Sequence, residues 1–383
     1  MSRWRNFCIT ELADFCNAQR IPLSAMERAH KKGNFPYYGA SGIVDYIDNY
    51  IFDGSYILIS EDGENLKSRK TPIAFEATGK FWVNNHAHVL KAKKPHLTAL
   101  IIQYFSQLDL SPYLTGAAQP KLNKASLNLI PLYLPIDESE QKAIASILSS
   151  LKDKIDLLHH QNKTLELMAE TMFRQWFILD ETGASVNLEQ IIDFNPKRTL
   201  TKSQDATYLD MAGLSTVIFR ANGYYRRPFS SGTKFTKRDT LLARITPCLE
   251  NGKAAYIDFL DDNETGWGST EFIVMRPKKE IHPFISYIMC RNPDFKEYAE
   301  SCMEGSTGRQ RVNLDHLKKF NVNLPTEASL RIINELLDSF ESKLINNSKQ
   351  IDSLEKLRDT LLPKLMSGEV RVQYAEEAIA SVA

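Results

Sequence analysis

The sequence lacks the features that would assign it to several common classes of protein. It contains no run of eighteen apolar residues, which argues against a membrane-spanning helix. Its five cysteines are odd in number and form no C-x-x-C pair: Cys8, Cys16, Cys248, Cys290 and Cys302. This pattern disfavours a disulfide framework or a zinc site and is typical of free thiols in a reducing compartment. We therefore expect a cytoplasmic protein with no metal site.

Motifs for a bound nucleotide or methyl donor are also missing. The sequence has no G-x-x-x-x-G-K-[ST] phosphate loop and no G-x-G-x-x-G turn. The stretch "NPDF" at 292–295 partly matches the N-P-P-[FY] site of amino-methyltransferases, but an aspartate replaces the second proline. We interpret it as structural, so the sequence predicts no catalytic residue and no cofactor on this chain.

The net charge of zero conceals segments of opposite sign. Lys+Arg against Asp+Glu are 15 and 11 in residues 1–135, 5 and 9 in 136–182, 0 and 2 in 183–196, 20 and 15 in 197–325, and 7 and 10 in 326–383. Two basic regions thus alternate with two acidic ones. This alternation favours two contacts with a polyanion, although an excess of four or five charges is modest.

One passage occurs twice. Leu134-Pro135 aligns with Leu324-Pro325 at a spacing of 190, and the following helical patterns align at 189. Upstream, Lys121, Leu122 and Asn123 align with Arg311, Val312 and Asn313. The spacing is far too long for a solenoid repeat. It indicates a duplicated module made of one lobe and one helix.

The two helical patterns carry heptad stripes. In the first, Ile144, Leu151, Leu158, Leu165 and Met172 recur at sevens, supported by Ile147, Leu148, Ile155, Met168 and Trp176. In the second, the stripe holds Ile333, Phe340, Leu354 and Leu361, supported by Leu336, Leu337, Leu344, Leu357 and Leu365, and Asn347 interrupts it. Each helix would span about 40 residues, or roughly 60 Å. The helices could each pack on their own lobe, but a sustained heptad favours antiparallel pairing with each other, which would relate the lobes by a pseudo-twofold.

The two lobes, residues 1–135 and 179–325, show the same order of predicted elements. Strand-and-turn patterns lead to "GKFWVNNHAHVLKAKK" in the first lobe and "TGWGSTEFIVMRPKK" in the second. A predicted helix follows in each ("HLTALIIQYFSQLDL"; "FISYIMCRNPDFKEYAE"), and then a loop ("TGAAQPKLN"; "STGRQRVN"). Trp82 and Trp267 hold corresponding places, and both are predicted to be core residues.

Basic and aromatic residues in both lobes are candidates for DNA contact. Residues 220–253 contain eight basic and two acidic residues with interleaved aromatics. Arg and Lys neutralise phosphates, and Arg and Gln also bond to base edges. The alternative is a solvated loop surface. The predicted DNA-binding residues are Lys31, Lys32, Tyr37, Tyr38, Lys67, Arg69, Lys70, Gln119, Lys121, Arg220, Tyr224, Tyr225, Arg226, Arg227, Lys234, Lys237, Arg309, Gln310 and Arg311.

Several of these stretches together resemble one known family. The helix starts "LPIDESEQKAIASIL" and "NLPTEASLRIINELL", the segment "LRDTLLPKLMSGEV" and the lobe segment "PYYGASGIVDYIDNYIFDGSYILISEDGENL" resemble the specificity subunits of type I restriction–modification systems. The resemblance covers residues 4 to 372. The second helix start departs from the family pattern, because it lacks the Glu-Gln pair kept at Glu140-Gln141.

The resemblance implies a fold and a function. The expected class is α+β, with two target-recognition lobes of mixed strands and helices separated by two long antiparallel coiled-coil helices. The expected bounds are 1–135 and 179–325 for the recognition domains, 136–178 and 326–370 for the helical spacers, and 371–383 for a tail. Each lobe would bind half of a split site in double-stranded DNA. Two methyltransferase subunits and the restriction subunits would be partners, and they would carry S-adenosylmethionine, ATP and Mg²⁺.

Two other classes of function remain open from the residues alone. A DNA methyltransferase or nuclease with built-in recognition lobes would need a cofactor loop, which the sequence lacks. A structural coiled-coil adaptor would not require basic lobes between acidic helices.

Overall fold

The computed structural model describes residues 3–116, 119–278, 280–306, 308–370 and 372, and the chain divides into two compact units. Unit 1 comprises residues 1–156 and 350–383, and unit 2 comprises residues 157–349. Each unit therefore holds one lobe and part of each long helix. The predicted tail, residues 371–383, lies outside the described residues except for Val372. Across the described ranges, every helix is too short or too polar to cross a membrane.

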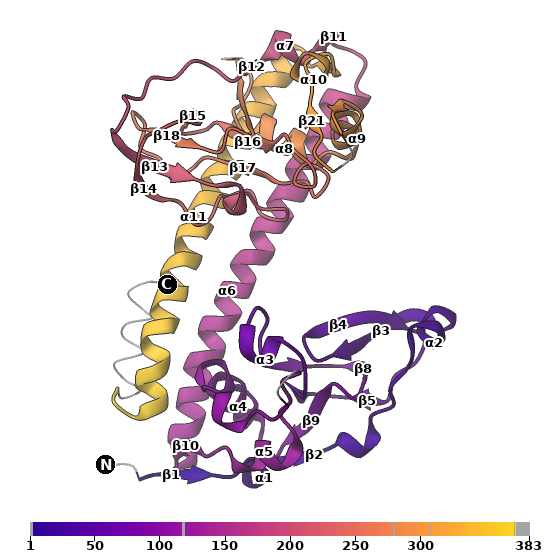
Figure 1. The fold of residues 1–383 in the computed structure, drawn as a ribbon, viewed down its shortest axis with the longest axis vertical. Coiled ribbons are helices and arrows are strands. Elements are labelled where there is room, and N and C mark those ends of the chain that lie inside the picture. Colours follow the sequence, from indigo (N-terminus) through magenta and orange to yellow (C-terminus); the bar gives the residue numbers. More distant parts are fainter. Residues whose placement is uncertain (1–2, 117–118, 279, 307, 371, 373–383) are drawn as a thin grey trace. The chain divides into compact units, whose positions relative to one another are not determined.

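The described strands of unit 1 form three sheets (Figure 1). The orders are β1-β10, β2-β9-β6-β7 and β4-β3-β8-β5. The strand bounds are β1 Trp4–Phe7, β2 Ala13–Phe15, β3 Lys32–Gly39, β4 Gly42–Ile47, β5 Phe52–Asp53, β6 Tyr56–Ser60, β7 Ala74–Ala77, β8 Lys80–Val83, β9 Ala87–Ala92 and β10 Leu132–Pro135. Strand β6, "YILIS", is apolar on both faces because it lies between β9 and β7 with packing on each side.

Short helices cover these sheets in unit 1. Their bounds are α1 Ile9–Leu12, η1 Asn17–Gln19, α2 Ala25–His30, α3 Asn65–Ser68, α4 Pro95–Gln107, η2 Ser111–Tyr113 and α5 Lys124–Leu129. The predicted helix of this lobe is α4, which begins at Pro95, a residue suited to the first helical turn. Its buried side chains Leu97, Leu100, Ile101 and Phe105 recur at helical spacing and face the core.

Unit 2 repeats the sheet orders of unit 1. The orders are β11-β22, β12-β19-β16-β17 and β14-β13-β18-β15, with an added β20-β21 hairpin. The bounds are β11 Ala184–Asn187, β12 Ile192–Phe194, β13 Asp205–Leu209, β14 Tyr225–Pro228, β15 Thr233–Thr236, β16 Thr240–Ala243, β17 Ala254–Tyr256, β18 Thr265–Gly268, β19 Phe272–Pro277, β20 Met303–Glu304, β21 Arg311–Val312 and β22 Asn321–Leu324. In each unit the second four-stranded sheet contains one parallel pair, β3 with β8 and β13 with β18.

These parallel pairs put the two tryptophans at equivalent positions. Trp82 pairs with Tyr37 across β8 and β3, and Trp267 pairs with Tyr208 across β18 and β13. Both indoles are buried, with exposed fractions of 6% and 2%. The predicted correspondence and the predicted core role of Trp82 and Trp267 are therefore confirmed.

The short helices of unit 2 are α7 Leu188–Ile191, η4 Met211–Gly213, α8 Ile285–Arg291, α9 Pro293–Ser301 and α10 Leu314–Leu317. The single helix predicted from "FISYIMCRNPDFKEYAE" is divided, because α8 ends at Arg291 and α9 begins at Pro293. The buried Asn292 caps α9, and its side chain accepts a hydrogen bond from the backbone N–H of Phe295 at 3.1 Å. The "NPDF" stretch is thus a helix start, which accounts for its residues structurally.

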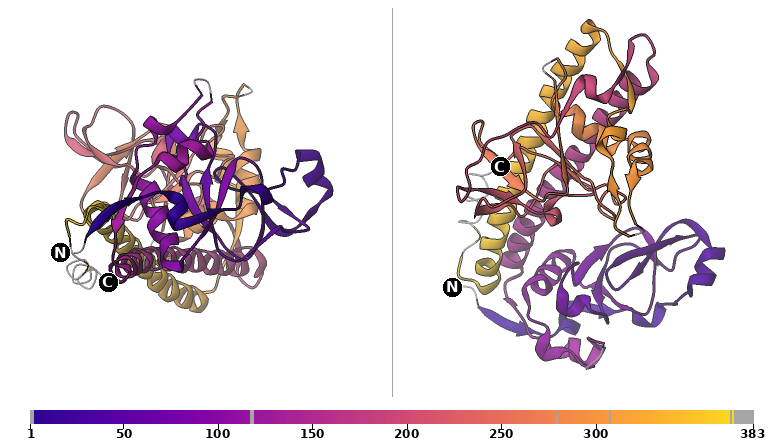
Figure 2. Two further views of the ribbon diagram at one scale, coloured as in Figure 1. Left: turned by 90° about the horizontal axis from the view of Figure 1, so that it is seen from below. Right: turned by 45° about the horizontal axis from the view of Figure 1, so that its top comes forward.

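Two long helices complete the fold. Helix α6 spans Glu138–Phe173 and continues into the π-helical turn η3 Arg174–Leu179, and α11 spans Glu327–Ser367. In each unit the early part of one helix lies beside the late part of the other, so the helices run antiparallel (Figures 1 and 2). Glu138 lies in the first turn of α6, where Lys94 and Lys142 lower its pKa to about 2.

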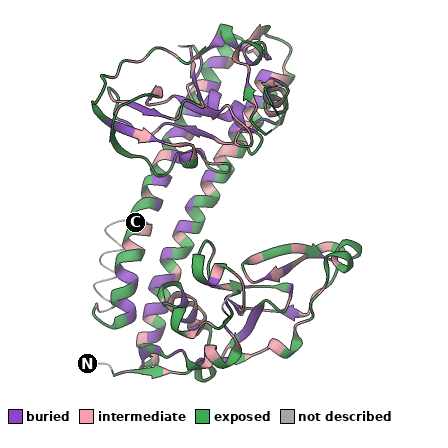
Figure 3. Cartoon of the chain, in the orientation of Figure 1, coloured by how far each residue is buried: buried purple, intermediate pink, exposed green. Residues whose placement is uncertain are grey.

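The heptad stripes are largely buried, as Figure 3 shows along both helices. Two of the predicted stripe residues are exceptions, since Met168 and Leu336 are 48% and 43% exposed. They lie at the edge of the stripe, outside the contact between the helices. The buried stripe accounts for the length of both helices, because each apolar layer stabilises the next.

Candidate nucleic-acid interface

The sheet β14-β13-β18-β15 of unit 2 carries a cluster of aromatic and cationic side chains. The rings of Tyr208 and Trp267 lie 4.5 Å apart, and the guanidinium of Arg227 lies 5.1 Å and 5.6 Å from their centroids. Phe229 packs edge-on to Trp267 at 5.3 Å, and Lys234 lies 4.8 Å from the Phe229 ring. Both cations therefore rest on aromatic faces, Arg227 on the exposed strand β14 and Lys234 on β15, and these contacts hold them in place.

Other predicted cations of this sheet are paired with carboxylates. Arg226 bonds to Asp205 at 2.8 Å and approaches Glu264 at 3.4 Å, and its side chain is 60% exposed. The pKa of Arg226 is raised, mainly by its hydrogen bond to Asp205. Lys237 bonds to Asp262 at 2.8 Å. These pairs are at the surface, where a phosphate could replace the carboxylate at small cost.

Two further predicted residues, Tyr224 and Tyr225, precede or begin β14 and are exposed. Tyr224 stacks flat on Phe259, with ring centroids 3.9 Å apart, and Tyr225 packs edge-on to Tyr208 at 5.4 Å. In contrast, Arg220 has only 14% of its side chain exposed and forms an ion pair with Asp258 at 2.8 Å. Arg220 is therefore already paired within unit 2, and its role as a DNA contact stays a prediction.

Three arginines surround one carboxylate where the β20–β21 hairpin meets the end of β16. Arg311 donates to Glu271 at 2.7 and 2.9 Å, and Arg244 lies 3.9 Å from the same carboxylate. The Arg311 bond is the main cause of the lowered pKa of Glu271, and the charges of Arg244 and the exposed Arg309 contribute. The cluster, which we call the arginine cluster, keeps a positive excess. Arg244 belongs to the basic run of residues 220–253 but was not among the predicted DNA-binding residues, because its place in the cluster depends on a bridge between Ile245 and Arg311.

Backbone bonds position the loop that carries these arginines. Gln310 donates from its backbone N–H to the hydroxyl of Thr246 at 3.1 Å, and its carbonyl accepts from the Thr246 N–H at 3.1 Å. The Gln310 side chain is half-buried at this junction. The loop is thereby tied to the strand end at β16 as well as to its own hairpin.

The equivalent place in unit 1 has the opposite arrangement of charge. The same backbone hydrogen bonds and bridges occur at the strand ends of both units. They make Glu61, His86 and Lys121 of unit 1 the counterparts of Arg244, Glu271 and Arg311 of unit 2, in that order. Lys121 lies 3.5 Å from Glu61, which also binds Arg20 at 2.7 Å. Gln119 is exposed at the edge of this group. The unit 1 loop end therefore has no comparable excess of positive charge among the described residues.

In unit 1 the aromatic pair equivalent to Tyr208 and Trp267 is covered by the chain itself. Tyr37 is 1% exposed, and its hydroxyl accepts from the Leu23 N–H at 2.9 Å. Trp82 donates to the carbonyl of Ile21 at 2.6 Å. Lys31 lies 6.0 Å from the Trp82 ring, and Lys32 pairs with Asp45 at 2.6 Å. Tyr37 thus belongs to the core, and its prediction as a DNA contact is wrong.

The remaining predicted residues of unit 1 divide into exposed and structural ones. Lys67 and Lys70 are exposed around the end of α3. Arg69, with φ 49°, ends that helix and donates to the carbonyls of Ser106 and Leu108, so its guanidinium is used in holding α4. Tyr38 is half-buried and packs edge-on to Phe81 at 5.5 Å. Arg69 and Tyr38 therefore act mainly in the fold.

The sequence missed the exposed strand β4. This strand is the counterpart of β14 and presents Ile43, Val44 and Tyr46 with exposed fractions of 48%, 57% and 50%. Such apolar residues on an edge strand are unusual in a solvated sheet. The sequence signal for these exposed residues was the unbroken "GIV" after a glycine turn, because apolar and polar residues normally alternate along a strand that has one face in solvent.

Unit 2 also contains a group of metal-ligand type. His282, Asp338 and Glu341 place ligand atoms within 4.8 Å of one another. However, Arg238 lies 3.1 Å from His282 Nε2 and 2.5 Å from Glu341, and the hydroxyl of Tyr256 donates to Glu341 at 2.6 Å. The guanidinium of Arg238 and the hydroxyl of Tyr256 already bond to these ligand atoms, so the arrangement does not fit a divalent cation. Its role is to hold the second lobe on α11.

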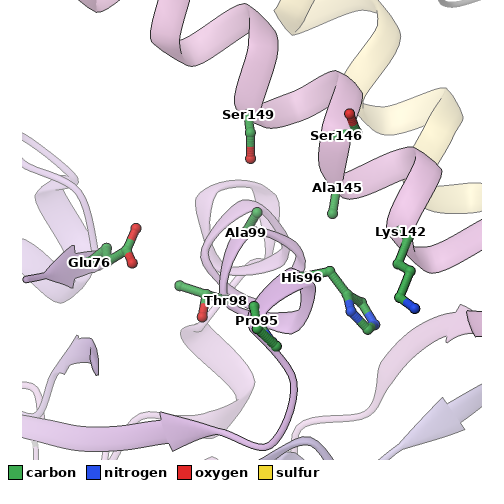
Figure 4. Close-up of a pocket in the computed structure, with 9 residues that line it drawn as sticks. All are labelled: Glu76, Pro95, His96, Thr98, Ala99, Lys142, Ala145, Ser146 and Ser149. Carbon is green, nitrogen blue, oxygen red and sulfur yellow. The ribbon is translucent and has the colours of Figure 1, made fainter. Parts of the chain in front are cut away.

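A groove in unit 1 runs between α4 and α6 (Figure 4). It consists of adjoining cavities of about 310 and 980 Å³, both lined by Glu76, Ala99 and Ser149. Figure 4 shows Lys142 of α6 at one end of the groove and Glu76 on the other side of α4. Because its charges are mixed, the groove lacks the basic excess of a phosphate-binding surface. None of the residues that line the groove is among the predicted DNA-binding residues.

Comparisons with known proteins agree on one family. The profile of the family described as "Type I restriction modification DNA specificity domain" matches residues 1–167 and 181–356. The chain is 27% identical to a putative type I restriction enzyme specificity subunit of Haemophilus influenzae, over 87% of this chain and 86% of the relative. It is 24% identical to the MjaIX specificity subunit of Methanocaldococcus jannaschii, over 89% of this chain and 88% of the relative.

A solved structure has the same fold. The S subunit of a type I restriction–modification system from M. genitalium matches with a TM-score of 0.62, over 95% of this chain and 96% of that one. Its sequence identity is 16%, so this likeness establishes the architecture alone.

Proposed function

Because this chain belongs to the family of type I restriction–modification specificity subunits, we propose that each of its lobes binds one half of a split DNA site. The observation that carries the proposal is the duplication itself. Two lobes with the same strand orders differ in chemistry at equivalent surface positions. Two copies of one scaffold with different contact residues suit two different half-sites.

The second lobe offers side chains for both kinds of DNA contact. Arg309 and Arg311 in the arginine cluster would neutralise phosphates or bond to guanine, and Gln310 stands between them. The β13–β14 hairpin offers Tyr225 and Arg227 on an exposed edge, and a two-stranded ribbon fits the major groove. In the first lobe, Ile43 and Val44 of the β3–β4 hairpin would contact thymine methyl groups.

The long helices would serve as the spacer and as the docking surface for two methyltransferase subunits. Leu157, Leu167 and Met168 of α6 and Ile332 and Leu336 of α11 are each at least 43% exposed. All five lie within unit 2. If these exposed apolar residues form one patch, it would suit a protein interface. The centres of the two half-sites would then lie about one helical turn of DNA apart, roughly 10 bp.

We assign the chemistry to the partners. The methyltransferase subunits would bind S-adenosylmethionine and flip the target adenine out of the duplex. Restriction subunits, with ATP and Mg²⁺, would add cleavage. This chain would contribute selection of the site and no catalytic residue.

The decisive experiment is single-molecule sequencing of modified adenines in cells that express this chain with its candidate methyltransferase. Cells with the methyltransferase alone are the control. We expect a two-part motif that requires this chain, with the bases of each half set by one lobe. If the two proteins fold and associate but no motif depends on this chain, the proposal is wrong.

The spacer role has its own test. A heptad inserted in α6 after Leu158, matched by a heptad in α11 after Lys349, adds about 10 Å of helix. At 3.4 Å per base pair, the preferred gap should lengthen by about 3 bp. A gap that stays unchanged in the extended protein would show that the helices do not set it.

A further inference from the structure

The apolar stripes of α6 and α11 are each interrupted by an asparagine, and the two asparagines meet. Asn162 takes the heptad place that Leu148 and Ile155 hold earlier in α6, and Asn347 takes the place of Ile333 and Phe340 in α11. Both are buried, with exposed fractions of 9% and 2%. Asn347 Nδ2 donates to Asn162 Oδ1 at 2.9 Å, so the two interruptions form one polar layer within unit 2.

Neighbouring side chains complete the bonding of this layer. Asn347 Nδ2 also donates to Gln161 Oε1 at 3.3 Å, and Asn162 Nδ2 donates to Ser348 Oγ at 3.3 Å. Ser348 in turn donates to the carbonyl of Leu344 at 2.7 Å. A buried amide without a partner is costly, so the layer is stable only when the two asparagines face each other.

The layer has no counterpart in the repeat. At the offset of 189 that relates the helix starts Glu138 and Glu327, Asn162 corresponds to Ile351 and Asn347 to Leu158. Ile351 and Leu158 are buried apolar residues, 6% and 3% exposed. At each of these two pairs of equivalent positions, one helix therefore has a buried asparagine and the other has a buried apolar residue.

This asymmetry matters because duplicated helices can also pair between molecules. If α6 paired antiparallel with α6 of a second copy in the same register, Asn162 would face Leu158. If α11 paired with α11 of a second copy, Asn347 would face Ile351. Either pairing would bury two asparagines against apolar side chains.

A shift of one heptad within the chain has the same consequence. Asn162 would then face Phe340 or Leu354, and Asn347 would face Ala169 or Ile155. Each alternative leaves both amides without a bonding partner. A single polar residue in a coiled-coil stripe is known to select partner and register at the expense of stability.

We propose that Asn162 and Asn347 are positioning residues that select the pairing of α6 with α11 of the same chain and fix its register. The layer thereby prevents assembly through like helices of two copies. Its effect on the DNA gap rests on the proposed function, because a fixed register is what would make the gap a single length.

The test replaces the layer with apolar residues in the full-length chain, as N162L/N347L. Size-exclusion chromatography with light scattering, and mixing of two differently tagged copies, measure pairing between molecules without DNA. We expect a higher Tm and about tenfold more mixed-tag complex than wild type gives. Modified-base sequencing with the methyltransferase should reveal a second gap length. The matched control is N346A, which changes an exposed asparagine next to the layer, leaves the asparagine pair and Ser348 intact and should behave as wild type.

The outcomes separate this inference from the proposed function. A double variant that remains unmixed and keeps one gap overturns the inference. If N162L/N347L does not fold, N162A/N347A removes the layer without added volume and is judged by the same two measurements. A wild-type chain without any split motif would contradict the proposed function, yet the tag-mixing result would still decide the role of the layer.

Discussion

The two lobes have the same strand orders but use equivalent positions in opposite ways. At the strand end where unit 2 holds Arg244 and Arg311 around a carboxylate, unit 1 holds Glu61 and Lys121. The buried strands that support these positions are apolar in both units. The comparison shows that core packing determines the scaffold, while the side chains at the loop ends can change the sign of their charge without disturbing that scaffold.

The contacts between each lobe and the helices differ as well. Glu341 of α11 is buried among Arg238, Tyr256 and His282, whereas the repeat-equivalent residue of α6 is Lys152, 63% exposed and paired with Asp156. Burial raises the pKa of Tyr256 and lowers that of His282, which keeps both neutral beside the carboxylate. The second lobe is thus fastened to its helix by a polar network, and the matching helix position in unit 1 faces solvent.

The largest expected effect comes from breaking this network. Glu341→Ala leaves the hydroxyl of Tyr256 without its acceptor and leaves Arg238 with the longer contact to Asp338 at 3.4 Å, which should destabilise unit 2 by about 3 kcal/mol. The corresponding fall in Tm is roughly 5–10 °C. Differential scanning calorimetry measures it.

The matched control is Lys152→Ala at the repeat-equivalent position. Because its ion pair is exposed, the loss should be under about 0.5 kcal/mol. Equal losses for the two variants would show that the polar network adds nothing beyond a surface pair.

The next effect concerns DNA. Replacing Arg309 and Arg311 together with Ala removes two cations of the arginine cluster, and affinity in the methyltransferase complex should fall about 30- to 100-fold. Fluorescence anisotropy across a salt series measures it, and the salt dependence should weaken. Lys319→Ala removes an exposed charge from the same lobe as a control. Unchanged affinity and specificity would remove this cluster from the interface.

Much of the architecture could be predicted because it depends on local patterns. The heptad stripes predicted α6 and α11 nearly to their ends. The offset of 190 aligned Lys121 with Arg311, and the backbone bridges confirm that the two residues hold equivalent positions. The stripe was less accurate at its edges. Met168 and Leu336 occupy predicted stripe positions but are exposed, because the heptad pattern does not specify how wide the buried face of each helix is.

The individual contact residues were harder to predict, because their roles depend on partners distant in sequence. Tyr37 and Tyr38 share a strand, and neighbouring side chains point to opposite faces; only the sheet's packing shows that Tyr37 is covered by residues near Leu23. Arg220 forms an ion pair with Asp258, which lies 38 residues further along the chain. Composition identified the basic run but could not show which of its cations were already paired.

A smaller effect should follow pH. Burial raises the pKa of Glu166 on α6 to about 7, against the hydrogen bond from Tyr287 at 2.9 Å and the charge of Arg291, with Glu170 adding repulsion. The folded state therefore holds this proton more tightly than the unfolded state does. Stability from this group is present below the ordinary pKa near 4.5 and is lost as pH rises towards 7.

We expect unit 2 to be about 1–2 kcal/mol less stable at pH 8 than at pH 5 through Glu166. Glu166→Gln should remove this part of the dependence, as measured by urea unfolding at both pH values. Glu355, the repeat-equivalent residue in unit 1, supplies the control variant Glu355→Gln. An identical pH profile for wild type and Glu166→Gln would contradict the assignment.

The smallest effect is predicted for Lys121→Ala, the counterpart of the Arg311 change. Lys121 is 49% exposed and lies 3.5 Å from Glu61, which Arg20 also holds at 2.7 Å. Because its charge is largely balanced in place, its removal should reduce DNA affinity less than about threefold and lower the salt dependence by at most one phosphate contact. The same anisotropy series measures it. A loss as large as that of the Arg309 and Arg311 variant would mean that both loop ends bind phosphate alike. The reversal of charge between the lobes would then have no part in distinguishing their half-sites.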